Sequence, residues 1–121
     1  MNVSKEIKNY KELEQVARKA TLYFLTFIKE IIICREEWEN PKTKMAFIER
    51  FHNEYFAGEE NCSIERTRNR VNCAIRIIES HMVEDALEIV INSNEAKMDI
   101  YEARINAIET LEEIKLGKLK Y

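Results

Sequence analysis

Glycine and proline are scarce in this chain, which has two glycines and one proline among 121 residues. All-β sandwiches and barrels need a turn about every 8–12 residues, and glycine and proline supply many of those turns. Glutamate tolerates helix interiors better than aspartate and makes up 20 of the 22 acidic residues. These features predict an all-α fold.

The length suits one domain, with residues 1–8 as a mobile lead-in and residues 9–121 as a single helical domain. The most apolar stretch, residues 20–34, is interrupted by Lys29 and Glu30 and is too short to cross a bilayer. No apolar signal-peptide core follows the first residues. The three cysteines have no zinc or thioredoxin spacing. We therefore expect a cytoplasmic protein with reduced thiols and no membrane partner.

We expect a bundle of four to five helices that begins with a long N-terminal helix over residues 10–38. Asn9 followed by Glu12 resembles a capping box. Apolar positions then recur in steps of three and four as a heptad stripe: Tyr10, Leu13, Ala17, Ala20, Phe24, Phe27, Ile31, Cys34 and Trp38. An unbroken helix of this length is about 44 Å long. A domain of this size is about 35 Å across, so the helix would overhang and need a partner to cover its stripe.

Asn40 and Pro41 predict the start of a second helix, which runs to about residue 56 with Gly58 as its C′ residue. Met45 is expected on the inner face of this helix. Ser63 predicts the next N-terminus, and its helix has an inner face of Ile64, Val71, Ile75, Ile78 and Met82. Residues 64–91 form either one helix or two, with a kink or break favoured near Ser80.

Asn92 and Glu95 form a second capping box and predict a last helix over residues 93–116, which Gly117 ends. Its inner stripe is Ala96, Ile100, Ala103, Ala107, Leu111 and Ile114. The three alanines allow a neighbouring helix, of this chain or of a second copy, to approach closely.

Four arginines lie between residues 61 and 81: Arg66, Arg68, Arg70 and Arg76. They form the candidate binding site. Arg66 and Arg70 point away from the apolar face, one turn apart, whereas Arg68 occupies a slot on the apolar stripe. An arginine there must reach water, pair with an acid or meet an anionic partner. We expect an ion pair with a glutamate, and phosphate binding is the alternative.

Arg76 and His81 stand five positions apart, with Ile77-Ile78-Glu79-Ser80 between them. This segment resembles the R-x(4–6)-H signature of the HEPN ribonucleases, helical bundles that dimerise to form an RNA-cleaving site. The resemblance implies that Arg76 and His81 act on the scissile phosphate and the 2′-hydroxyl. It covers six residues, and Ile77 departs from the polar residue usual after the arginine.

Glu49 and His52 have the E-x-x-H spacing of a di-iron bundle, but the second copy that such a site needs is missing. His52 lies on an apolar face, which favours a core histidine hydrogen-bonded to a neighbour. We therefore assign no metal, no cofactor and no catalytic residue.

These observations favour a small non-enzymatic helical protein that acts by protein–protein association, as an accessory, adaptor or inhibitor. The expected partners are a second copy, as a homodimer or higher oligomer, and another protein. The first alternative is binding of nucleic acid or an anionic nucleotide through Arg66–Arg76, and the second is a HEPN-like ribonuclease.

Overall fold

A computed structural model describes residues 6–59, 62–100 and 102–121, and within these ranges it contains helices and no strand. The helices are α1 (Tyr10–Ala20), α2 (Leu22–Leu25), α3 (Ile28–Ile33), α4 (Arg35–Glu39), α5 (Pro41–Tyr55), α6 (Ile64–Glu79), α7 (Val83–Ile91), α8 (Lys97–Ile100) and α9 (Ala103–Lys115). The prediction of an all-α fold is confirmed.

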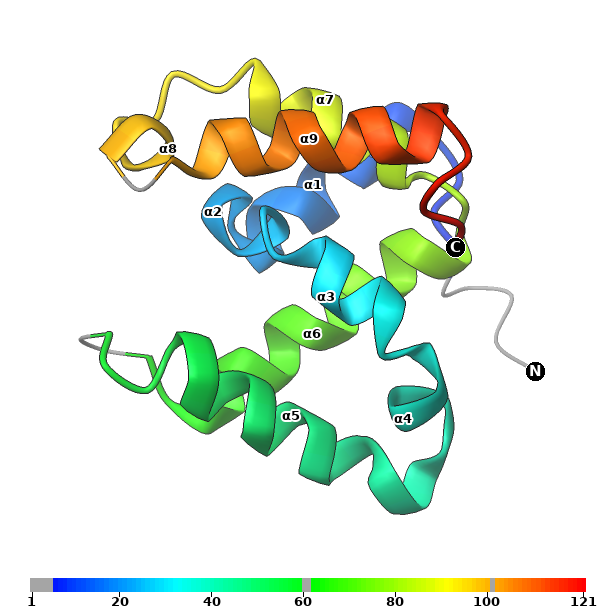
Figure 1. The fold of residues 1–121 in the computed structure, drawn as a ribbon, viewed down its shortest axis with the longest axis vertical. Coiled ribbons are helices and arrows are strands. Elements are labelled where there is room, and N and C mark those ends of the chain that lie inside the picture. Colours follow the sequence, from blue (N-terminus) through cyan, green and yellow to red (C-terminus); the bar gives the residue numbers. More distant parts are fainter. Residues whose placement is uncertain (1–5, 60–61, 101) are drawn as a thin grey trace.

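The helices stack in layers, with α1 and α2 in the middle (Figure 1). α1 packs mainly on α6, α7 packs on α9, and α5 lies against both α4 and α6. α2 contacts α7, so the start of the chain separates the C-terminal helices from α5 and α6. The layers share one core, whose largest fully buried side chains include Phe24, Phe47, Phe51 and Phe56.

The expected long helix over residues 10–38 is wrong, because this segment forms the four helices α1 to α4. The first break is at Thr21, whose φ of 74° lies outside the helical region. Its hydroxyl accepts a hydrogen bond from the Phe24 backbone N–H at 3.3 Å, which caps α2. The Thr26 hydroxyl donates to the Tyr23 carbonyl at the end of that short helix.

Burial explains why the long helix does not form. Apart from Lys29 and Glu30, residues 22–32 carry apolar side chains on nearly every side, and Leu22, Phe24, Leu25 and Ile28 are all at most 2% exposed. A straight helix would present these side chains in all directions along a rod that the rest of the chain is too short to surround. Breaking the rod folds each apolar face onto a neighbour. The overhang that suggested self-association through this segment is therefore absent.

Helices α5 and α6 begin where the sequence predicts. The Asn40 side chain accepts from the Lys42 N–H with Pro41 in the first turn, and the Ser63 hydroxyl accepts from the Arg66 N–H. Three details differ from expectation. α5 is C-capped by Phe56, so Gly58 is not its C′ residue and has no positive φ, and the side chains of Met45 (43% exposed) and Ile64 (36%) lie at the surface.

The break expected near Ser80 is confirmed, because α6 ends at Glu79 and α7 begins at Val83. His81, with a φ of 59°, reverses the helical path between them. The Ser80 hydroxyl does not cap α7. It accepts a hydrogen bond from the Ile7 N–H at 2.9 Å. Ile7, expected in a mobile lead-in, is instead 4% exposed in the core, while residues 1–5 of that lead-in lie outside the described residues.

The single last helix expected over residues 93–116 is wrong, since α8 and α9 are separated by Glu102 with a φ of 55°. Ala96 and Ile100 are exposed as a result, whereas Ala103 and Ala107 are buried against α7 as the small-residue face. Gly117, with a φ of 75°, ends α9 as expected. The N–H of Lys118 reaches the Glu113 carbonyl and the N–H of Gly117 reaches that of Ile114, which is a Schellman motif.

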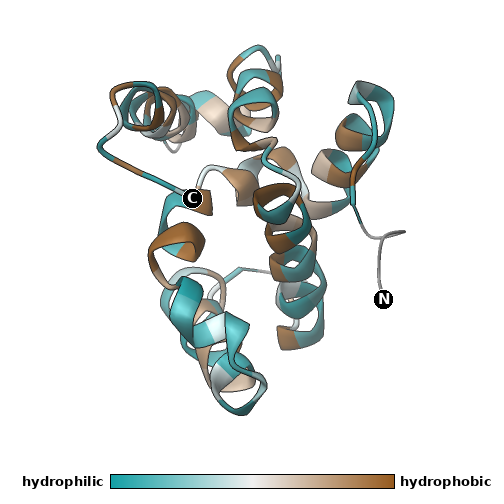
Figure 2. Cartoon of the chain, turned by 90° about the vertical axis from the view of Figure 1, so that its right-hand side faces the viewer, coloured by the Kyte–Doolittle hydropathy of each residue, from teal (hydrophilic) through white to brown (hydrophobic). Residues whose placement is uncertain are grey.

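Most helices carry hydrophobic and hydrophilic residues on opposite sides, as Figure 2 shows. Within the described residues, no helix combines the length and the apolar character needed to span a bilayer.

Candidate functional site

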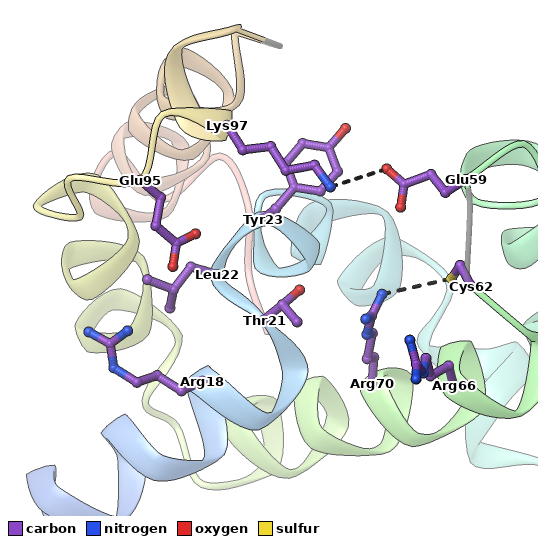
Figure 3. A pocket seen from close by; sticks show the side chains of 10 residues that line it. All are labelled: Arg18, Thr21, Leu22, Tyr23, Glu59, Cys62, Arg66, Arg70, Glu95 and Lys97. Atoms are coloured by element: carbon purple, nitrogen blue, oxygen red, sulfur yellow. Dashed lines mark hydrogen bonds and ion pairs between the residues drawn. The ribbon is translucent and has the colours of Figure 1, made fainter.

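A pocket of about 350 Å³ opens where the junction of α1 and α2 faces the start of α6 and the segment around α8 (Figure 3). The described residues lining it come from three stretches of the chain, 18–23, 59–70 and 95–97: Arg18, Thr21, Leu22, Tyr23, Glu59, Cys62, Arg66, Arg70, Glu95 and Lys97. We call it the basic pocket. The turn at Thr21 is what brings the end of α1 and the start of α2 to its wall.

Three arginines are among the residues that line the basic pocket, with Arg66 and Arg70 side by side and Arg18 apart from them, nearer to Leu22 and Glu95 (Figure 3). Arg66 and Arg70 are four residues apart on α6, so they project from the same face of that helix. Arg70 Nη1 donates to the Cys62 sulfur at 3.7 Å. Arg18, from the last turn of α1, makes no side-chain hydrogen bond or ion pair with any described residue. The described part of the lining therefore includes three arginines, two of them neighbours on α6.

The other charged residues among the described lining are one lysine and two glutamates. Lys97 Nζ lies 3.5 Å from a Glu59 carboxylate oxygen and 4.6 Å from the centre of the Tyr23 ring. Glu95 is exposed, and its carboxylate has no hydrogen-bond or ion-pair partner among the described residues. The charge of Lys97 is thus balanced by Glu59, whereas the Glu95 carboxylate has no ion-pair partner among the described residues.

The pocket has a positive excess in an acidic chain. The described residues of its lining include four basic and two acidic side chains, a net charge of +2, whereas the whole chain has a formal net charge of −3. Like charges held around one pocket repel one another, and a bound anion relieves that repulsion. Guanidinium groups also match the oxygens of phosphate or carboxylate with paired hydrogen bonds. The arrangement is suited to holding a small anion.

A chain of polar groups connects the pocket to the core. The Cys62 sulfur lies 3.6 Å from the Thr67 hydroxyl, which lies 2.7 Å from His52 Nδ1. Thr67 is fully buried and His52 is 8% exposed. The interpretation of His52 as a core histidine hydrogen-bonded to a neighbour is therefore confirmed. These contacts hold the segment that precedes α6, and with it Cys62, against the helix.

The structure brings together only two of the four candidate arginines, Arg66 and Arg70. Arg68 was expected on the apolar stripe, but its side chain is 47% exposed and lies 3.4 Å from Glu65 on the same helix. Thr67 takes the buried position instead, since its hydroxyl is satisfied by His52. The expected ion pair of Arg68 with a glutamate is therefore present, whereas its expected place on the apolar stripe is wrong, because a short polar side chain with a core partner is cheaper to bury than a guanidinium.

Arg76 lines a different and wider groove of about 1060 Å³, together with Lys19, Lys44, Asn69, Asn72 and Cys73. Its Nη2 donates to a Glu12 carboxylate oxygen at 2.8 Å, which ties α6 to α1. His81 is not among the residues that line this groove. It is exposed beyond the end of α6, and its ring centre lies 6.2 Å from that of Tyr121.

The thiols of Cys34 and Cys73 lie outside the basic pocket. Burial, followed by a hydrogen bond to Glu37, raises the pKa of Cys34 to about 11, and burial also raises the pKa of Cys73. Both thiols stay protonated near neutral pH. Among the described residues, no group of three or more histidine, cysteine and acidic side chains is placed to hold a metal ion.

Sequence reasoning missed Arg18, Glu95 and Lys97. The position of Arg18 is that of an ordinary last-turn cation of an amphipathic helix, and Glu95 and Lys97 were expected near the start of the predicted last helix. No sequence motif links them to Arg66 and Arg70, which are 48 or more residues from Arg18 and 25 or more from Glu95. Only the packing of α1 on α6 and the position of α8 place them together.

No protein-family model matches the chain, and no curated protein or solved structure matches it significantly.

Proposed function

We propose that this protein binds a small phosphate-bearing molecule in the basic pocket. The observation that supports the proposal is that three arginines line one pocket and that Arg18 has no partner among the described residues. Pockets for small molecules usually enclose about 300–1,000 Å³. The basic pocket, at about 350 Å³, suits a ligand the size of a mononucleotide better than an extended polymer.

Binding of adenosine 5′-monophosphate and of adenosine, measured by isothermal titration calorimetry, tests the proposal. We expect the phosphate-bearing ligand alone to bind. Arg18→Gln and Arg70→Gln should each weaken it about tenfold, because each removes a charge-assisted hydrogen bond. The matched control is Arg68→Gln, since Arg68 lies on the same helix as Arg70 but outside the pocket.

Two outcomes would overturn the proposal. The first is equal affinity for the nucleoside and the nucleotide. The second is an equal loss of affinity in the control variant and in the pocket variants. A single-stranded oligonucleotide separates the small-anion proposal from nucleic-acid binding. An affinity above that of the mononucleotide, falling with salt by about 0.7 logarithmic units per phosphate contact, would favour nucleic acid instead.

A second candidate function is self-association through the outward face of α9. Ile105 (54% exposed), Ile108 (36%) and Leu116 (68%) lie on one side of this helix, opposite the alanines that pack on α7. At about 100° per residue, Glu109 borders this stripe on one flank and Lys115 on the other. Two parallel copies of α9 would place the acidic flank of each beside the basic flank of the other. A second copy therefore fits the three apolar side chains and the charged flanks, while Glu112 lies between Ile105 and Ile108 on the same exposed face.

Light scattering at tens of micromolar tests this second candidate. We expect a dimer for the natural chain and a monomer for Ile105→Glu and for Leu116→Glu, which place a charge in the apolar contact. Met45→Glu is the matched control, because Met45 is an exposed apolar residue on α5. A monomer for the unchanged protein would remove this candidate.

A further inference from the structure

The wide groove that contains Arg76 follows one side of α6. Four of its lining residues occupy positions i, i+3, i+4 and i+7 of that helix, so they share a face: Asn69, Asn72, Cys73 and Arg76. This face lies opposite the side that buries Val71 and Ile78 in the core. α6 packs against both α1 and α5, and these helices contribute Lys19 and Lys44 to the lining. We call this surface the α6 groove.

Two asparagine amides in the α6 groove are available for a ligand. Asn69 and Asn72 are exposed, and neither side chain makes a hydrogen bond with a described residue. A side-chain amide carries both a donor and an acceptor, so it can pair with a backbone C=O and a backbone N–H. An α-helix bonds these backbone groups internally, whereas an extended segment leaves them open. The two amides therefore favour an extended peptide over a partner helix.

The charges along the α6 groove narrow the choice further. Lys19 and Lys44 have no ion-pair partner among the described residues, whereas Arg76 is already held in an ion pair with α1. The carboxylates of Glu6 and Glu79 also line the groove. They would repel a ligand of uniform negative charge, such as a nucleic-acid strand. A peptide with a few acidic side chains can meet the lysines and leave these glutamates in water.

The dimensions of the α6 groove suit a short stretch of polypeptide. From Asn69 to Glu79 the groove follows the helix for about 15 Å, at about 1.5 Å per residue. An extended peptide advances about 3.3 Å per residue, so about four or five of its residues lie along this length. The volume of about 1060 Å³ exceeds that of the basic pocket, at about 350 Å³.

We infer that the α6 groove binds an extended acidic segment of another protein. The backbone of this segment pairs with the amides of Asn69 and Asn72, and its carboxylates pair with Lys19 and Lys44. The described lining residues of the α6 groove and of the basic pocket are all different, so this second site is independent of phosphate binding. It gives the protein a surface for a protein partner.

Selection from a phage-displayed library of random short peptides tests the inference, and fluorescence polarisation then measures the affinity of the enriched peptides. We expect the enriched sequences to contain aspartate or glutamate. Asn69→Ala and Asn72→Ala should each weaken binding about five- to tenfold, because each removes hydrogen bonds to the peptide backbone. Lys19→Gln and Lys44→Gln should weaken binding and also reduce its dependence on salt.

Matched controls on α5 separate the groove from the rest of the surface. Asn53→Ala and Lys42→Gln replace exposed residues outside the groove and should leave the affinity within about twofold. Arg70→Gln, in the basic pocket, should also leave it unchanged. Methylating the backbone nitrogens of the peptide one at a time should weaken binding about tenfold at one or more positions, because the methyl group removes a donor to asparagine.

Four results would overturn the inference. The first is a selection that enriches no peptide. The second is an equal effect of Asn53→Ala and of the two groove asparagine variants. The third is full binding by every methylated peptide, which would show that the backbone is not read. The fourth is a single-stranded oligonucleotide that binds more tightly than the enriched peptides and loses affinity in Lys19→Gln, which would make the groove a nucleic-acid site.

Discussion

His52 on α5 and Thr67 on α6 meet in the core, with the Nδ1 atom 2.7 Å from the hydroxyl oxygen. Both side chains are buried, and within the described residues no buried side-chain nitrogen or oxygen lacks a hydrogen-bond partner. The contact joins the two helices that form one side of the protein. It also fixes the helix that carries the pocket arginines Arg66 and Arg70.

Replacing Thr67 with valine keeps the shape of the side chain and removes its hydroxyl. We expect the free energy of unfolding to fall by about 1–3 kcal/mol, because His52 Nδ1 is left buried without a partner. Urea denaturation measures the change. In a double-mutant cycle with His52→Leu, the second substitution should cost less in the Thr67→Val background than alone. Additive effects of the two substitutions would show that the contact contributes nothing.

Arg104 anchors the C-terminal end of α7. Its guanidinium donates to the backbone carbonyls of Ile91 and Ser93, the latter at 2.7 Å, and to Asp99 at 2.9 Å. We expect Arg104→Met to lower the free energy of unfolding by about 2 kcal/mol, since these carbonyls lose their donor. Arg68→Met is the control and should change it by less than about 0.5 kcal/mol, because Arg68 makes only an exposed ion pair with Glu65. Equal thermal melting shifts for the two variants would contradict this account.

The two glycines differ in backbone conformation and form a matched pair. Gly117 has a φ of 75°, whereas Gly58 has no positive φ, and neither position would bring an added Cβ within 4 Å of another group. We expect Gly117→Ala to destabilise the protein by about 1–2 kcal/mol through backbone strain alone. Gly58→Ala should be neutral or slightly stabilising, because alanine restricts the unfolded chain. The comparison uses the midpoint of thermal unfolding, and similar losses for both variants would count against the Schellman motif.

Tyr121 makes stability sensitive to alkaline pH. Burial, followed by a hydrogen bond of 3.0 Å to Glu84, raises its pKa to about 12 from an ordinary value of 10. Between these values the folded chain keeps a proton that the unfolded chain has lost, so stability falls as the pH rises. We expect the contribution of Tyr121 to be complete below pH 10 and absent above about pH 12.

Tyr121→Phe should reduce the slope of stability against pH in this interval, and should also remove a late step from the tyrosinate absorbance titration. Some alkaline sensitivity will remain in the variant, because burial also raises the pKa of Tyr55 to about 12. A slope unchanged by the substitution would show that Tyr121 does not contribute.

Local chemistry alone determined the helical class and several helix ends. Asn9, Asn40 and Ser63 each accept a hydrogen bond from a backbone N–H within the next three residues, and Gly117 adopts a positive φ that other residues resist. These interactions involve neighbours in the sequence, so their pattern is readable from the sequence. The sequence also indicated a break near Ser80. That the chain turns through a positive φ at His81 was visible only in the structure.

Only the tertiary structure decided how residues 10–38 break and which side chains meet at the pocket. The same heptad pattern is compatible with one long helix and with several short helices that fold back on one another. Which of the two forms depends on the side chains that cover the apolar residues around Phe24. The exposure of Arg68 followed from a contact between Thr67 and His52 on another helix. The basic pocket joins segments distant in sequence, because long-range packing of α1 on α6 brings Arg18 to Arg66 and Arg70.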